Sequence, residues 1–97
     1  MSRWLVEKRL AQSSQRIRRL RAELEVLDEQ LLVLADEASD ARLRAVVSET
    51  PMAHHADNEA QRQVEAMNRQ RNHLVEAIGE LERSQDELLD RLVDGVA

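Results

Sequence analysis

The stretch of sequence that decides the fold runs from residue 17 to residue 34 and reads IRRLRAELEVLDEQLLVL. Its large apolar residues recur at alternating spacings of three and four, at Ile17, Leu20, Leu24, Leu27, Leu31 and Leu34. This is the heptad pattern of a coiled coil, in which positions a and d are apolar. With Ile17 as position a, the pattern continues back to Val6, interrupted by Ser13, and forward to Ala45. We therefore predict a first helix over about residues 3–47.

The second half of the chain repeats the pattern. Its a and d positions are Ala60, Val64, Met67, Arg71, Leu74, Ile78, Leu81, Gln85, Leu88 and Leu92. Between the stripes, Thr50 followed by Pro51 is typical of a helix start, because threonine caps a helix and proline suits its first position. We expect a bend at about residues 48–51 and a second helix over about 51–93. The predicted fold is all-α: a single antiparallel coiled-coil hairpin spanning residues 1–97.

The register of this hairpin has two candidate solutions. If facing residues have numbers that add up to 98, every a position meets a d position and the polar Ser13 lies opposite Gln85. A matched polar pair inside an apolar seam is a known way to fix register. A slip of one heptad, to a sum of 105, also pairs a with d, although it places Gln85 opposite Leu20. We prefer the sum of 98.

Composition excludes several functional classes. The 97 residues contain no cysteine, one aromatic residue, two glycines and one proline. Without cysteine there is no disulfide framework and no thiolate metal site, and no glycine-rich phosphate loop is present. No apolar run approaches the roughly 20 residues of a membrane span. We expect a cytoplasmic protein that is not an enzyme and has no catalytic residues, metal or cofactor.

Charge is distributed unevenly along the chain. The net charge is −5, yet residues 1–21 carry seven cations and one acid, while residues 22–60 carry two cations and ten acids. The most basic segment offers a candidate surface for phosphates or an acidic partner, made of Arg16, Arg18, Arg19 and Arg21. No aromatic residues interleave with these arginines, so nucleic-acid binding is not favoured over pairing with acids of the second helix.

The bend is the second candidate surface. Near it lie Glu49, His54, His55 and Asp57. Acidic bends resemble the tips of coiled-coil hairpins that enter the secondary channel of RNA polymerase. The alternative hypothesis for function is a regulatory factor that presents its bend or its basic segment to a nucleic-acid machine such as RNA polymerase or the ribosome.

Apolar residues outside the seam indicate a third candidate surface. Val26 and Val33 share heptad position c, and Leu32 is adjacent to Val33. Such a second stripe is expected to pack on a partner helix or on another copy of the chain, and two hairpins would then form a four-helix arrangement. The leading hypothesis is therefore a non-enzymatic coiled-coil interaction or scaffold module whose protein partner is unknown and which self-associates.

Two segments resemble known families. Residues 34–51, LADEASDARLRAVVSETP, resemble small uncharacterised actinobacterial coiled-coil proteins, a likeness that implies no activity. Residues 20–34 resemble the first helix of the all-helical chorismate mutases, in which Arg21 would match a substrate-binding arginine. That family's second arginine would fall at Ala38 and its lysine near Glu49. A chorismate mutase-like enzyme is thus the last of the three hypotheses.

Overall fold

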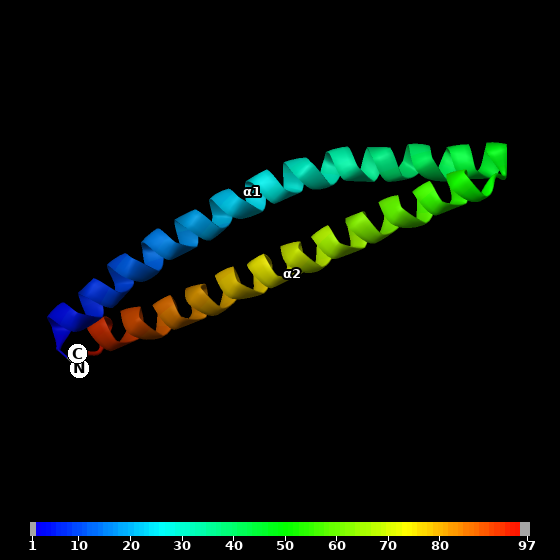
Figure 1. Cartoon of the computed structure of the whole chain (residues 1–97). Helices are drawn as coiled ribbons and strands as arrows, with labels where there is room; N and C mark the ends of the chain where they lie inside the picture. The colour runs from blue at the N-terminus through cyan, green and yellow to red at the C-terminus, as the bar shows by residue number, and fades with distance from the viewer. Residues whose placement is uncertain (1, 96–97) are drawn as a thin grey trace. The chain divides into compact units, whose positions relative to one another are not determined.

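The chain is an all-α helical hairpin. The structure, a computed structural model, describes residues 2–95. These residues form two helices, α1 over Arg3–Ser48 and α2 over Pro51–Val93, and no strand (Figure 1). The observed helix ends lie within one residue of the ends expected from the heptads and from Thr50-Pro51.

The hairpin divides into two compact units. The terminal unit comprises the described parts of Met1–Leu24 and Leu74–Ala97, and the bend unit comprises Glu25–His73. In each unit a segment of α1 lies beside a segment of α2 and runs in the opposite direction (Figure 1). The terminal unit holds the first and last described residues, and the bend unit holds the connection between the helices.

The connection consists of Glu49 and Thr50. Glu49 has a φ of 53°, in the left-handed region, and its N–H donates to the Ala45 carbonyl over 3.0 Å. Residues in this conformation commonly end helices, although glycine or asparagine usually takes the position. The Thr50 hydroxyl then accepts the Ala53 N–H at 3.1 Å. The prediction that Thr50 caps the second helix is confirmed.

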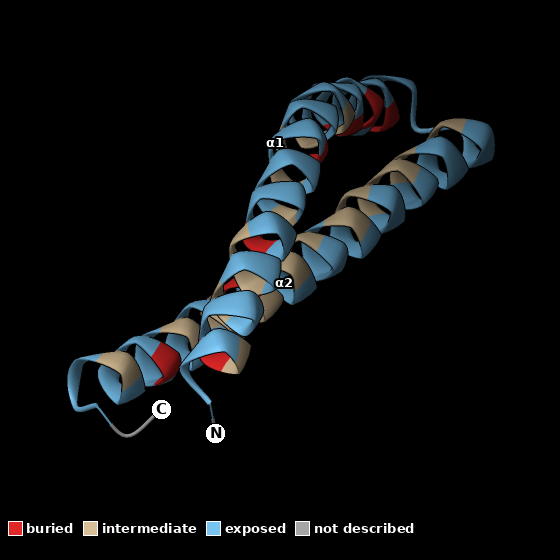
Figure 2. Cartoon of the chain, turned by 90° about the vertical axis from the view of Figure 1, so that its left-hand side faces the viewer, coloured by how far each residue is buried: buried red, intermediate tan, exposed pale blue. Residues whose placement is uncertain are grey.

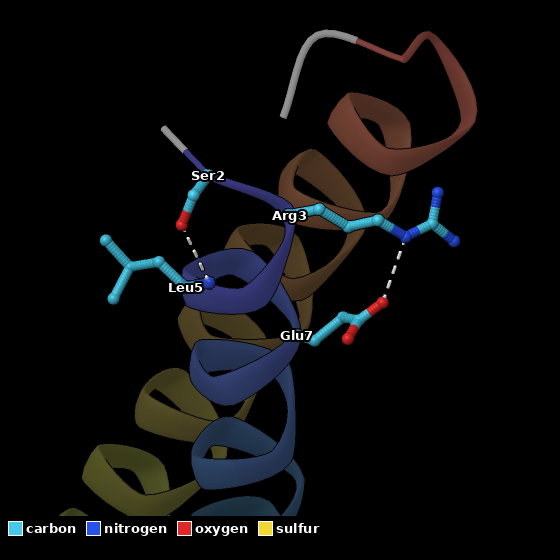
Figure 3. Close-up of polar contacts among 4 residues, drawn as sticks. All are labelled: Ser2, Arg3, Leu5 and Glu7. Carbon is cyan, nitrogen blue, oxygen red and sulfur yellow. Dashed lines mark hydrogen bonds and ion pairs between the residues drawn. The ribbon is translucent and has the colours of Figure 1, made fainter.

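The start of α1 and the end of α2 also carry residues that are typical of helix ends. The Ser2 hydroxyl accepts the Leu5 N–H at 3.2 Å, and Arg3 pairs with Glu7 across one turn at 3.1 Å (Figure 3). At the far end of α2, Gly95 has a φ of 69°. This left-handed conformation suits glycine, which has no Cβ to clash, and it accounts for the helix ending at Val93.

The apolar seam follows the heptads. The buried residues, drawn red in Figure 2, all lie at predicted a or d positions: Val6, Ile17, Leu27, Ala38, Ala41, Ala45, Ile78 and Leu88. The remaining predicted a and d positions are half-buried. Local periodicity alone therefore determines which face of each helix packs.

Hydrogen bonds between the helices show which of the two registers the hairpin adopts. In the terminal unit the Gln85 amide donates to the Ser14 hydroxyl over 2.7 Å. In the bend unit Arg71 Nε donates to Asp28 Oδ1 over 2.6 Å. Both pairs have numbers that add up to 99, which agrees with the facing sum of 98 and not with 105.

The expected pairing of Ser13 with Gln85 is wrong in detail. The amide of Gln85 bonds to Ser14, the neighbour of Ser13 on the flank of the seam. The Ser13 hydroxyl is buried and has no hydrogen-bond partner within the described residues. A glutamine side chain is long enough to place its amide at the flank, whereas the short serine at the seam position keeps its hydroxyl inside.

Candidate interaction surfaces

The candidate residues at the bend do not form one surface. Glu49, His54 and His55 are exposed. The Asp57 side chain, in contrast, is only 18% exposed and lies in the seam between α1 and α2. Its Oδ1 accepts the Gln61 amide at 3.1 Å and lies 3.8 Å from Arg42 Nε. Asp57 is thus occupied by contacts inside the bend unit.

Gln61 connects Asp57 to α1. Its Nε2 donates both to Asp57 Oδ1 and to the Ala38 carbonyl, each over 3.1 Å. On the α1 side, the seam consists here of small residues. These are Ala38, Ala41 and Ala45, which are only 2–4% exposed. Small side chains leave room for a carboxylate and an amide in the seam, and the hydrogen bonds satisfy these polar groups.

The sequence carried a signal for this arrangement. Stepping back from Ala60 by the heptad spacings of three and four reaches Asp57 and then Ala53. Both residues are half-buried. The heptads of α2 therefore begin almost at the bend, and an acid occupies one of their inward positions.

The four arginines of the basic segment also differ in their contacts. Arg16, Arg18 and Arg19 are exposed, but Arg21 donates to Glu82 on α2 over 3.1 Å. Arg18 and Arg21 border a shallow hollow of about 270 Å³ that also includes Ser14, Ile17 and Gln85. The segment is therefore partly an internal contact of the terminal unit and partly a free basic surface.

The strongest surface feature is an exposed aliphatic face on α1 in the bend unit. We define the aliphatic face by its six members: Val26, Leu32, Val33, Leu43, Val46 and Val47. Each is 54–76% exposed. Val26 and Val33 were identified from the sequence together with Leu32, but the last three members were missed. They occupy heptad positions f, b and c, on the same outward side of α1 as the earlier three residues, which occupy positions c, b and c.

No site for a metal or a membrane is found in the described part of the chain. Among residues 2–95, no three histidine, aspartate or glutamate side chains lie close enough together to hold a metal ion. Neither α1 nor α2 contains, within these residues, an apolar stretch of the length needed to cross a membrane.

Comparisons with known proteins give no match. No family model matches the chain, and neither the curated proteins nor the solved structures contain a match to it.

Proposed function

We propose that this protein is a non-enzymatic coiled-coil interaction module that binds a protein partner through the aliphatic face. The observation that carries the proposal is the exposure of six large aliphatic residues along one side of one helix. Single exposed apolar residues are normal on a protein surface. Six at repeating outward heptad positions form an ordered stripe of the kind that marks an interface.

The chemistry of the stripe favours a helical partner. Its members lie at positions b, c and f, in two clusters, one around Val33 and one around Val46. Between the clusters lie Asp36 and Asp40, which are exposed. An amphipathic helix aligned with α1 would contact both clusters, since its apolar residues recur with the same period.

The seam explains why the face is available. The a and d residues of α1 and α2 pack against each other, so the apolar seam of the hairpin does not include the aliphatic face. Burying the face on a partner adds apolar contact at no cost to the hairpin. Because the chain has no cysteine, nothing ties this module to an oxidising compartment, and we expect it to act in the cytoplasm.

The test is partner capture with a matched pair of variants. Val26, Leu32 and Val33 are changed together to Gln, which keeps helix propensity but removes the apolar surface. The control variant changes Leu89 and Val93, exposed residues of α2 in the terminal unit, to Gln. A partner identified with the native chain is purified and titrated against all three proteins.

The proposal expects the first variant to lose binding and the control to retain it. Far-ultraviolet circular dichroism checks that both variants remain helical. Retained binding of every partner by the folded first variant would contradict the proposal.

A further inference from the structure

The outward positions of α1 change character between the two units. Between residues 4 and 22, positions b, c and f carry three cations, Lys8, Arg18 and Arg19, and no acid. Between residues 25 and 47, the same positions carry four acids, Glu25, Glu29, Asp36 and Asp40, and no cation. One continuous helix, Arg3–Ser48, therefore presents a basic outer face in the terminal unit and an acidic, aliphatic one in the bend unit.

These charges form no ion pair inside the hairpin, and Lys8 alone among them lies over an aromatic ring, with its Nζ 5.1 Å from the centre of Trp4. All seven side chains are exposed, and none forms an ion pair within the described residues. Arg21, at an inward-flanking position, pairs instead with Glu82. The outer faces thus carry complementary charge that the single chain leaves unpaired.

We propose that the aliphatic face is covered by a second copy of this chain, with the two α1 helices packed antiparallel, outer face to outer face. The basic outer face of each copy then lies on the aliphatic face of the other. This inference rests on the proposed function and names the occupant of its surface. The contact is isologous, so it closes into a dimer with four helices.

The heptads allow registers that differ by seven residues, and we propose the one with a sum of 51 because of the neighbours it gives Arg18 and Trp4. If facing residues of the two copies have numbers that add up to 51, position f meets f and position b meets c. Arg18 then faces Val33, with Glu29 and Asp36 of the second copy one turn to either side. Each cation is thereby placed beside acids while its aliphatic stem covers apolar surface.

The exposed aromatic residue fits the same register. Trp4 is 67% exposed, and Lys8 Nζ lies 5.1 Å from the centre of its ring. At a sum of 51 Trp4 faces Val47, which is 76% exposed. Each end of the proposed contact is then closed by an indole ring on aliphatic side chains, and buried aromatic residues of this kind are common interface anchors.

Electrostatics disfavour the other ways of joining two copies through this face. A parallel arrangement would bring Glu29 and Asp36 of one copy beside the same residues of the second. Placing the two aliphatic faces directly on each other would gather all eight carboxylates. Gathered like charges oppose such arrangements, whereas the proposed register brings acids of the two copies together only near its centre, at Glu25 and Glu29.

Disulfide trapping tests the register. Because the native chain has no cysteine, only the introduced cysteines can form crosslinks. One chain carries Gln15→Cys and the other Asp36→Cys, both at exposed f positions whose numbers add up to 51. Mixing them under mild oxidation is expected to give mainly the crosslinked heterodimer. The pair Gln15→Cys and Leu43→Cys, with a sum of 58, is the control for a slip of one heptad. Preferential crosslinking of that pair, or of Gln15→Cys with itself, would overturn the proposed contact.

Charge exchange tests the chemistry. One variant carries Arg18→Glu and Arg19→Glu, and the other carries Glu29→Arg and Asp36→Arg. Each alone faces like charge in its own homodimer, so sedimentation should show dimers at least about tenfold weaker than native. Mixed together, the two variants should regain a dimer, because each acidic face again meets a basic one.

The outcomes of these experiments separate this inference from the proposed function. A native chain that sediments as a monomer, or a mixture of charge variants that does not recover a dimer, overturns the second-copy contact. Loss of a different purified protein partner by the Val26, Leu32 and Val33 variant would still support the interaction module, with that protein as occupant. A shift of a labelled duplex by the native chain alone would assign the basic outer face to nucleic acid instead.

Discussion

The two units of the hairpin share the same heptad pattern but differ in net charge and in where their large apolar side chains lie. The terminal unit contains nine cations and nine acids, and its seam contains the larger aliphatic residues Val6, Ile17, Ile78 and Leu88. The bend unit contains five cations and ten acids, and its seam narrows to alanine toward the connection. The bend unit buries Leu27 in its seam and, in addition, exposes large apolar side chains on the outside, in the aliphatic face. The difference is one of placement: the terminal unit buries large aliphatic side chains in its seam, whereas the bend unit exposes six of them on α1.

The largest expected effect comes from the seam of the terminal unit. Ile17 is 5% exposed, so Ile17→Ala should lower the free energy of unfolding by about 2–5 kcal/mol, through lost apolar transfer and the cavity left behind. Urea denaturation followed by circular dichroism measures this, at one fixed protein concentration because association adds to apparent stability.

The matched control is Leu89→Ala in the same unit. Leu89 is 46% exposed, so its truncation should cost less than half as much. Equal losses for the two variants would mean that the seam does not dominate the stability of the terminal unit.

Much of this comparison could be predicted from the sequence. Alternating spacings of three and four are a local property, and they identified every buried residue because burial in a hairpin follows the helical period. Thr50 was predicted as a cap for the same reason, since capping depends on two or three neighbouring residues.

Other features depend on contacts between the helices and were missed. An acid such as Asp57 is not expected at an inward position, and only the amide of Gln61 and the small residues opposite explain its place there. Glu49 adopts a left-handed conformation that sequence rules assign to glycine or asparagine. The exposed Leu43, Val46 and Val47 were missed for a different reason: the heptads already assign them to outward positions, but the pattern was used to find the seam and not the opposite face.

An intermediate effect is expected from enlarging the seam of the bend unit. Ala41 is 4% exposed and lies on the stripe of small residues that faces the start of α2. Ala41→Leu should lower the free energy of unfolding by about 1–3 kcal/mol, because added methylene groups must displace packed neighbours. Thermal denaturation monitored by circular dichroism detects the change.

Ala35→Leu provides the control for this overpacking. Ala35 is exposed on the same helix, so the same added side chain should change stability by no more than about 0.5 kcal/mol. An unchanged or raised stability in Ala41→Leu would show that the seam near the bend is loosely packed and that its alanines are not required.

The smallest effect distinguishes two adjacent serines of the terminal unit. The Ser13 hydroxyl is buried without a hydrogen-bond partner in the described chain, whereas the Ser14 hydroxyl accepts the amide of Gln85. Ser13→Ala removes an unsatisfied polar group and should raise the free energy of unfolding by about 1 kcal/mol. Ser14→Ala leaves the half-buried amide of Gln85 without its partner and should lower it by about 1 kcal/mol.

The opposite signs matter more than the sizes, because both substitutions replace serine with the better helix former and so share any gain in helix propensity. A difference between the two unfolding free energies of about 2 kcal/mol would place the register-fixing polar contact at Ser14 and Gln85. If Ser13→Ala were the destabilising variant, the pairing inferred from the heptads alone would be correct, and the Gln85 amide would point into the seam and not to its flank. In that case the terminal unit would hold a buried polar pair comparable to Asp57 and Gln61, and the contrast between the two seams would be one of side-chain size alone.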